Sequence, residues 1–530
     1  MKQIREACGM TTEEFSVKLG VSRSSIEHIE SGRNQPNVVY VKKLHQHFPQ
    51  YSLEYILYGE SSDIYEVEKN GEETKGEMND SIKEEYKLPE TCLFTKHFPE
   101  EQAITETEVN ETKKRIADVL KYFNIEFNSI NPTVGPSYTL YEITLAQGVR
   151  MGKVRCLEDD IALSIASVGV RVIAPIPGKG TLGIEIPHIR SCTIPLRFVG
   201  ESTDFQDTNM ALPIALGMGV DGKPILMNLA KAPHILIGGA TGQGKSNLIH
   251  TLIASLLLKK KPDELKLVII DSKRTEYGVY EPLRYHFLTG LPGKSERVIT
   301  DTDKAVQMLE CLCEEMDIRY DLLKKSGSRN IMEYNTKFEK GELESEEGHR
   351  FLPYIVLVVD DFGDLMLSGG KDVELPLCRI AQLARAVGIH AVIATQRPTR
   401  NIITDTIKAN FPARVAFRVA ATMDSRTILD RSGAQQLAGP GDMLVLHGRI
   451  ETKRFQAVFT DRQDMVNIVQ HISVQHSHTS TYPLPETKIK GSPHTDMDIR
   501  QAIDGLKRSI ERLESWLDDM NDEDFHFPNE

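Results

Sequence analysis

The chain has 530 residues, of which 40% are apolar and 26% charged, and its formal net charge is −13. At roughly 100 to 200 residues per domain, this length excludes a single small binding module and indicates several globular domains. The longest apolar stretches, such as residues 354–359, fall far short of the roughly 18 residues that a membrane span needs. The N-terminus also lacks the apolar core of a signal peptide. We therefore expect a cytoplasmic protein without a transmembrane segment.

The negative charge is concentrated in two segments. Residues 60–111 contain 16 acidic and 5 basic side chains, and residues 501–530 contain 9 acidic and 3 basic ones. The remainder is close to neutral, so the net charge neither favours nor excludes a nucleic-acid partner. Because residues 61–111 also contain few large apolar groups, they predict a flexible acidic linker.

Patterning along the chain predicts three further regions. Residues 1–60 are typical of short helices separated by glycines. Residues 112–228 mix helical and alternating patterns and predict a small α+β domain. From 466 to 530 we expect a polar tail with one amphipathic helix near residues 499–517. That helix either docks on its own domain or contacts a partner or a second copy.

Residues 229–465 predict an α/β domain. Short buried-strand patterns occur at residues 234–237, 267–270, 355–359 and 391–394, and helical patterns separate them. This alternation indicates a parallel sheet with crossover helices.

A phosphate-binding loop follows the first of these strands. It consists of Gly239, Ala240, Thr241, Gly242, Gln243, Gly244, Lys245 and Ser246, and a helical pattern comes after it. In such a loop the backbone N–H groups face the phosphates of ATP, the lysine reaches the β and γ phosphates, and the serine ligates Mg²⁺. The sequence therefore predicts ATP and Mg²⁺ as ligands.

Two carboxylates stand directly after the strand at 355–359. Asp360 is positioned as a Mg²⁺ ligand and Asp361 as the group that polarises the attacking water. A carboxylate at the end of a neighbouring buried strand is what a hydrolysing P-loop site needs, so hydrolysis is favoured over binding alone.

Four motifs occur in order: GATGQGKS at 239–246, VDDFGDLM at 359–366, LARAVGIH at 383–390 and ATQRP at 394–398. They resemble the FtsK/SpoIIIE family of DNA translocases, and the resemblance covers about residues 112–460. It implies a RecA-like P-loop motor domain preceded by a small α+β domain. It also implies a hexameric ring around double-stranded DNA with ATP between subunits.

The same resemblance implies roles for single residues. Arg385 is similar to an arginine finger that reaches a neighbour's ATP, and Gln396 to a sensor of the γ-phosphate. Arg397, Lys408 and Arg426 are similar to channel-facing cations that follow the phosphate backbone without reading bases. One departure is Asp361, because the family has a glutamate there.

Residues 4–32 resemble the Cro/repressor (XRE) helix-turn-helix family. Thr11 can cap a first helix, and a second helix would present its early residues to the major groove. These residues are Arg23, Ser24, Ser25 and His28. Residues 1–59 as a whole carry 7 basic and 6 acidic side chains, so we expect modest affinity for DNA unless oligomerisation multiplies it. A helical protein-interaction module is the alternative.

These features together predict an ATP-dependent double-stranded DNA translocase that its helix-turn-helix guides to DNA. Two alternatives remain open. One is a DNA-binding regulator that uses ATP as an assembly switch. The other is a mobile-element coupling protein that works with a relaxase or recombination partner.

Overall fold

The computed structural model describes residues 5, 11–19, 26, 86–95, 104–475 and 482–486, without 168, 177, 189–191, 275, 295, 346–347 and 448–451. The chain forms two compact units, Met1–Lys83 and Glu84–Glu530. Within the described residues, no helix is both long and apolar enough to cross a membrane.

In the first unit, helix α2 (Thr12–Leu19) begins directly after Thr11, where the helix-turn-helix pattern predicts a helix start. Phe15 and Ile26 are fully buried. The predicted groove-facing residues Arg23, Ser24, Ser25 and His28 lie outside the described residues.

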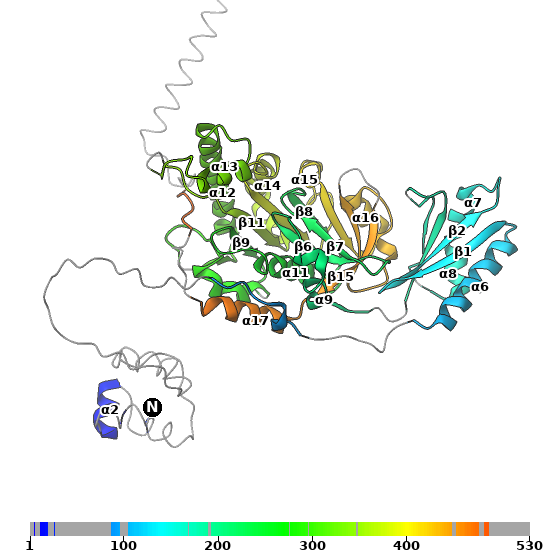
Figure 1. Ribbon diagram of the computed structural model, residues 1–530, viewed down its shortest axis with the longest axis horizontal. Coiled ribbons are helices and arrows are strands. Elements are labelled where there is room, and N and C mark those ends of the chain that lie inside the picture. Colours follow the sequence, from blue (N-terminus) through cyan, green and yellow to red (C-terminus); the bar gives the residue numbers. More distant parts are fainter. Residues whose placement is uncertain are drawn as a thin grey trace, which may run out of the picture. The chain divides into compact units, whose positions relative to one another are not determined.

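The second unit begins with a small α+β domain, as predicted (Figure 1). Its strands form an antiparallel sheet in the order β1-β2-β4-β3. Helix α6 starts with a capping box between Thr105 and Glu108, and it buries Ile116 and Leu120 against the sheet domain's core. The elements are α6 (Glu106–Tyr122), β1 (Phe127–Val134), β2 (Tyr138–Leu145), α7 (Met151–Arg155), α8 (Glu158–Ile165), β3 (Arg171–Ile173) and β4 (Leu182–Pro187).

A large mixed sheet forms the centre of the unit. Its order is β10-β9-β11-β12-β8-β13-β14-β15-β6-β7, and β5 (Ile194–Pro195) pairs with β15. The parallel strands are β10 (Val298–Ile299), β9 (Leu265–Asp271), β11 (Tyr354–Asp360), β12 (Ile389–Thr395), β8 (His234–Gly238) and β13 (Ala413–Phe417). The antiparallel strands are β14 (Asp442–His447), β15 (Lys453–Phe459), β6 (Pro213–Met218) and β7 (Pro224–Asn228). All four strands predicted for this region are confirmed.

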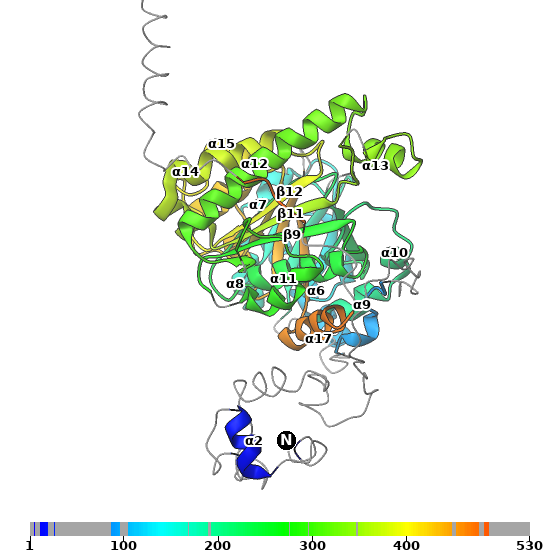
Figure 2. The ribbon, with the colours of Figure 1, turned by 90° about the vertical axis from the view of Figure 1, so that its left-hand side faces the viewer.

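Helices cover both faces of this sheet. Helices α12 (Thr302–Lys325) and α14 (Phe362–Leu383) lie on one face, and α11 (Lys245–Leu257) and α17 (Arg462–Ser473) lie on the other (Figure 2). The remaining elements are η1 (Thr91–Leu93), α9 (Leu196–Gly200), α10 (Thr203–Gln206), η3 (Tyr277–Tyr285), α13 (Ile331–Glu339), α15 (Asp405–Asn410), α16 (Thr422–Leu429) and η5 (Ala434–Gln436).

The domain boundaries differ from the prediction at the junction between the two domains. The small domain was expected to reach residue 228, but β6 and β7 belong to the large sheet because β6 pairs with β15. The small sheet ends with β4 at Pro187.

Two segments that were predicted to be a flexible linker and a polar tail are partly folded. They are residues 86–95 and the part of α17 that follows residue 465. Residues 86–95 pack on α17, where Phe94 is buried and Thr95 donates its backbone N–H to Asp464 Oδ1 at 2.8 Å. Helix α17 extends across residue 466, where the polar tail was expected to begin, and it buries Ile468 and Val469 of that segment. The amphipathic helix expected at 499–517 falls outside the described residues.

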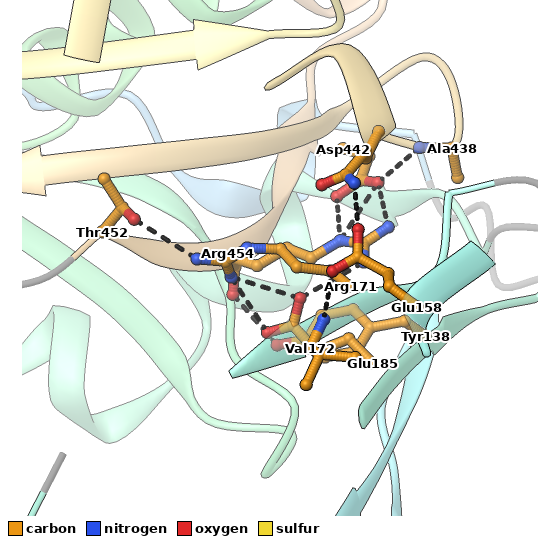
Figure 3. A network of polar contacts seen from close by, with 10 residues as sticks. Tyr138, Glu158, Arg171, Val172, Glu185, Ala438, Asp442, Thr452 and Arg454 are labelled. Carbon is orange, nitrogen blue, oxygen red and sulfur yellow. Dashed lines mark hydrogen bonds and ion pairs between the residues drawn. The ribbon is translucent and has the colours of Figure 1, made fainter. Parts of the chain in front are cut away.

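A buried polar network joins the small domain to the large sheet (Figure 3). Arg454 on β15 pairs with Asp442 on β14 (Nη2 to Oδ2, 2.7 Å) and with Glu185 on β4 (Nη1 to Oε2, 3.3 Å). Arg171 on β3 also pairs with Glu185 at 3.3 Å, and Tyr138 on β2 donates its hydroxyl to the Arg454 carbonyl. Charged side chains from the two sheets thus form ion pairs with one another where water is largely excluded.

Candidate nucleotide site

The phosphate-binding loop connects β8 to α11, which is the strand and helix context that the motif requires. Two glycines are needed there for steric reasons. A Cβ on Gly239 would lie 2.7 Å from Phe417 Cβ. Gly244 has φ of 116°, and a Cβ there would meet the Phe417 ring at 3.1 Å and the Gly441 amide at 3.3 Å. The loop is therefore held closely against β13 and the segment before β14.

Lys245 is buried at the first position of α11 and is only 4% exposed. Its Nζ donates to the Ala240 carbonyl at 2.7 Å, so the side chain folds back along the loop. Burial lowers the pKa of Lys245 to about 8, although the nearby Asp360 and Asp361 act in the opposite direction. A bound polyanion would favour the charged form of this lysine.

Strand β11, which ends in Asp360, is not the immediate neighbour of β8, which precedes the phosphate loop. Strand β12 lies between β8 and β11, so the carboxyl ends of three parallel strands meet at one edge of the sheet. Gln396, which directly follows β12, therefore lies between the phosphate loop and Asp360 and Asp361. The structure brings together the residues predicted for phosphate binding, for the metal and for the water.

The two carboxylates have different environments. Asp360 is 6% exposed, and burial followed by the neighbouring Asp361 charge raises its pKa to about 7. Asp361 has a left-handed backbone with φ of 48° at the start of α14. Its Oδ2 accepts from Gln396 Nε2 at 3.2 Å, and Gln396 Oε1 accepts from Thr241 Oγ1 at 2.6 Å. A chain of side-chain contacts thus connects the phosphate loop to the water-side carboxylate.

Sequence reasoning missed Lys273, which forms an ion pair with Asp361 Oδ2. Lys273 lies in the turn after β9, and buried Asp271 shapes this turn by accepting the backbone N–H groups of Lys273 and Tyr277 at 3.2 and 3.3 Å. Because Asp271 pairs with Asp360 in the sheet register, the turn ends beside the carboxylates. The signal in the sequence was a polar turn after the predicted strand at 267–270, but only the strand order makes it part of the site.

Arg385 lies away from this edge. It is exposed and precedes β12, whereas Gln396 follows β12. A strand of 7 residues spans about 20 Å, so Arg385 is at the opposite edge of the sheet from the phosphate loop of its own chain. Its guanidinium makes no hydrogen bond or ion pair within the described residues.

The three cations expected to face DNA are in different environments. Arg397 is exposed beside the nucleotide edge. Lys408 on α15 pairs with Asp430 at 2.8 Å, and its side chain is 20% exposed. Arg426 on α16 is exposed, and its carbonyl accepts the N–H of Asp430. Lys408 and Arg426 thus share Asp430 as a neighbour, whereas no hydrogen bond or ion pair among the described residues links Arg397 to either.

The residues at the nucleotide edge fit a Mg²⁺ nucleotide. In the phosphate loop, Gln243 Oε1 is buried without a hydrogen-bond partner in the described part of the chain. Buried Asp360 likewise has no cationic side chain paired with it there, while carboxylate and hydroxyl oxygens are the ligands that Mg²⁺ prefers. Ser246 and Asp360 are the residues that would hold the metal.

Comparison with known proteins agrees with this geometry. The sequence matches the FtsK/SpoIIIE family over residues 195–400, the FtsK alpha domain over 88–188 and a helix-turn-helix family over 1–56. It is 40% identical over 399 residues to the DNA translocase FtsK of Haemophilus influenzae, a match that covers 72% of this chain and 74% of that protein. The chain belongs to the FtsK/SpoIIIE family. The predicted P-loop motor domain, small α+β domain and helix-turn-helix module are confirmed.

Other FtsK proteins are longer than the region they share with this chain. The DNA translocase FtsK of Chlorobaculum tepidum is 43% identical over 416 residues, which is 78% of this chain and 50% of that protein. The chain thus spans about half the length of several relatives that it matches. Among solved structures, the pCW3 conjugation coupling protein TcpA with ATPγS aligns at 23% identity and a TM-score of 0.47, over 68% of this chain and 99% of that one.

Proposed function

We propose that this chain is an ATP-driven translocase of double-stranded DNA, directed to DNA by its N-terminal helix-turn-helix. The observation that carries the proposal is the separation of two functional groups. Lys245, Asp360, Asp361 and Gln396 meet at one edge of the sheet, whereas Arg385 is exposed at the other. Membership of the FtsK/SpoIIIE family supports this proposal.

Each residue at the nucleotide edge has its own role in ATP hydrolysis. Loop amides and Lys245 bind and orient the phosphates. Ser246 and Asp360 hold Mg²⁺, which supplies positive charge to the phosphate oxygens when it is bound. Asp361 accepts a proton from the attacking water, and Gln396 senses the γ-phosphate through its contacts with Thr241 and Asp361.

Arg385 acts on the nucleotide of a neighbouring subunit, because it lies too far from the phosphate loop of its own chain. This requires a head-to-tail contact between identical subunits, and we propose that these contacts close into a hexameric ring around the duplex. Arg397, Lys408 and Arg426 contact phosphates in the ring, whereas Arg23, Ser24, Ser25 and His28 contact the loading site. The place of action is the cytoplasm, where ATP and DNA are both available.

The test is steady-state ATP hydrolysis by the purified chain with and without long linear duplex. We expect strong stimulation by DNA, and loss of turnover in Lys245→Ala while DNA binding is retained. A rate that is indifferent to DNA would overturn the translocase proposal.

Subunit mixing tests the role of Arg385. Arg385→Ala and Lys245→Ala should each be inactive alone, because each lacks one half of every shared site. Mixed together they should recover part of the activity, since an intact loop then meets an intact arginine. A mixture as inactive as its components would contradict action between subunits.

One observation favours a second candidate, a DNA-binding regulator or coupling protein that uses ATP as an assembly switch. Asp361 is one methylene shorter than the glutamate of the family, and its carboxylate is engaged by Lys273 and Gln396. Hydrolysis would then be slow, and a relaxase or recombination partner would use the assembled form. Turnover that rises many-fold in Asp361→Glu over a nearly inert parent would favour this candidate.

A further inference from the structure

The segment that carries Arg385, residues 383–388, is here called the finger loop. Although Arg385 is exposed, Ala384 and Val387 on either side of it are fully buried. Four carbonyl oxygens of the loop accept hydrogen bonds from groups outside it. The donors are the Tyr320 hydroxyl to Leu383 (2.6 Å), the Ile331 amide to Ala386 (2.9 Å), Arg319 Nη1 to Val387 (2.9 Å) and the Ile355 amide to Gly388 (2.9 Å).

Arg319 on α12 is the charged member of this set of donors, and its side chain is fully buried. Its Nη1 also donates to the Pro353 carbonyl at 2.8 Å, just before β11. Its Nε pairs with Glu315 Oε1 at 2.7 Å. One guanidinium therefore connects α12, the finger loop and the strand that ends in Asp360.

The orientation of Arg319 depends on a distant part of the chain. Residues 482–486, here called the strap, place Tyr482 against the guanidinium, and Arg319 Nη2 donates to the Tyr482 hydroxyl at 3.0 Å. That hydroxyl donates in turn to Glu315 Oε1 at 2.6 Å. Leu484 anchors the strap in the core at 4% exposure, and Thr289 donates its hydroxyl to the Tyr482 carbonyl at 2.8 Å.

We propose that Arg319 and Tyr482 are positioning residues for ATP hydrolysis, which hold the finger loop so that Arg385 meets the nucleotide of a neighbouring subunit. This proposal rests on the proposed function of Arg385. The physical reason is that buried guanidinium N–H groups must find acceptors, so removing the Tyr482 hydroxyl lets Arg319 shift and loosens its bond to Val387. Arg385 is close to Val387 in the chain, and displacements near 1 Å at a reacting group can cost about 100-fold in rate.

The first measurement compares Tyr482→Phe with Tyr86→Phe by hydrogen exchange and by steady-state kinetics. Tyr86 is a matched control, because its hydroxyl is buried without a hydrogen-bond partner among the described residues. In Tyr482→Phe we expect faster exchange of the amides in residues 383–388 and a roughly tenfold lower kcat at unchanged KM for ATP. Tyr86→Phe should match the parent. Unchanged exchange of the finger loop in Tyr482→Phe would overturn the proposal.

The second measurement uses the mixture of Lys245→Ala and Arg385→Ala subunits. Tyr482→Phe is added to only one of these two variants at a time. The Lys245→Ala subunits donate the arginine, so Tyr482→Phe on them should lower the recovered activity about tenfold. On the Arg385→Ala subunits, which donate the phosphate loop, the same change should have little effect. Equal losses in both placements would mean a general structural role and would overturn the proposal.

Failure of the proposed function gives a different result. If the parent chain does not hydrolyse ATP, or if the unmodified mixture recovers no activity, the assignment of Arg385 fails. The exchange measurement then still decides whether Tyr482 holds the finger loop, since it needs no turnover.

Discussion

Gly244 shows how a single residue without a side chain sets the shape of the nucleotide site. Its φ of 116° belongs to the left-handed region, and Phe417 and the Gly441 amide occupy the space that a side chain would need. The Gly441 amide also donates to the Gln243 carbonyl at 3.0 Å. The phosphate loop is thus shaped in part by residues distant in sequence.

We expect Gly244→Ala to weaken binding of a fluorescent ATP analogue by at least about tenfold, because the loop must move away from Phe417. Gly293→Ala is a matched control, since Gly293 also has positive φ, of 69°, but has open space around its Cβ position. It should cost about 1 kcal/mol of stability and leave nucleotide affinity unchanged. Equal affinities for the two variants would show that the contact with Phe417 does not matter.

His234 at the start of β8 gives a prediction about pH. Its ring is fully buried, and its Nδ1 accepts the backbone N–H of Ala391 at 3.1 Å, so the fold requires an unprotonated Nδ1. Burial, followed by the repulsion from His390, lowers the pKa of His234 to about 3. The unfolded chain takes up a proton below about 6.5 and the folded chain does not. This contribution to stability is therefore complete above pH 6.5 and is lost as the pH falls toward 3.

We expect the free energy of unfolding to fall by about 1 kcal/mol more per pH unit between pH 6 and 5 in the parent than in His234→Asn. Asparagine offers an oxygen to the Ala391 amide but does not titrate. His447→Asn, at an exposed position, should keep the slope of the parent. Denaturant unfolding at each pH gives these slopes, and an identical slope for His234→Asn would refute the assignment.

At the scale of single residues, the sequence predicted those site residues that belong to a short continuous motif. The phosphate loop and Asp360 were recognisable because a glycine-rich turn and a buried strand each have a short signature. Lys273 was not predicted, because its contact with Asp361 depends on the register between β9 and β11. Nor did the sequence show that Gln396 bonds with Asp361 as well as with Thr241.

At the scale of elements, the segment of residues 86–95 is the clearest difference between pattern and structure. Averaged over the whole acidic region, its composition predicts a linker. A short apolar cluster nevertheless suffices to fix it on α17, where Asn467 donates to the Leu93 carbonyl and the side chain of Gln475 bonds with the backbone of Lys87. Local composition over about ten residues decided the structure here.

Phe94→Ala should destabilise the second unit by about 3 to 5 kcal/mol, as expected for deletion of a large side chain that is 2% exposed. Cys92→Ala changes an exposed residue of the same segment and should alter stability by less than about 0.5 kcal/mol. Thermal or denaturant unfolding measures both. If Phe94→Ala were as stable as Cys92→Ala, this segment would not be part of the folded domain.

The strands of the large sheet were predictable, whereas their order was not. Buried apolar runs at 234–237 and 391–394 indicated strands because parallel strands are covered on both faces. The assignment of β6 and β7 to the large sheet depends on pairing with β15, which lies more than 200 residues later in the chain. Pairings at that distance leave no pattern in a single sequence.

At the scale of the whole molecule, the second unit has two sheets with separate apolar cores that meet in a polar network. Glu185 belongs to the small sheet and Arg454 to the large one, and both are at most 3% exposed. Glu158 and Gln436 add a second contact across the same junction. Burying charges at a junction gives geometric specificity, because a displaced partner would leave an uncompensated charge.

Glu185→Ala should therefore cost about 3 to 5 kcal/mol, since Arg454 and Arg171 would each lose a buried partner. Glu142→Ala on β2 is the matched control: Glu142 pairs with Lys179, whose side chain is 56% exposed, and should cost at most about 1 kcal/mol. Because Glu185 bridges the two sheets, its loss should also separate thermal unfolding into two transitions, the first belonging to the small domain. A single transition shifted no further than that of Glu142→Ala would mean that the ion pairs of Glu185 do not hold the two cores together.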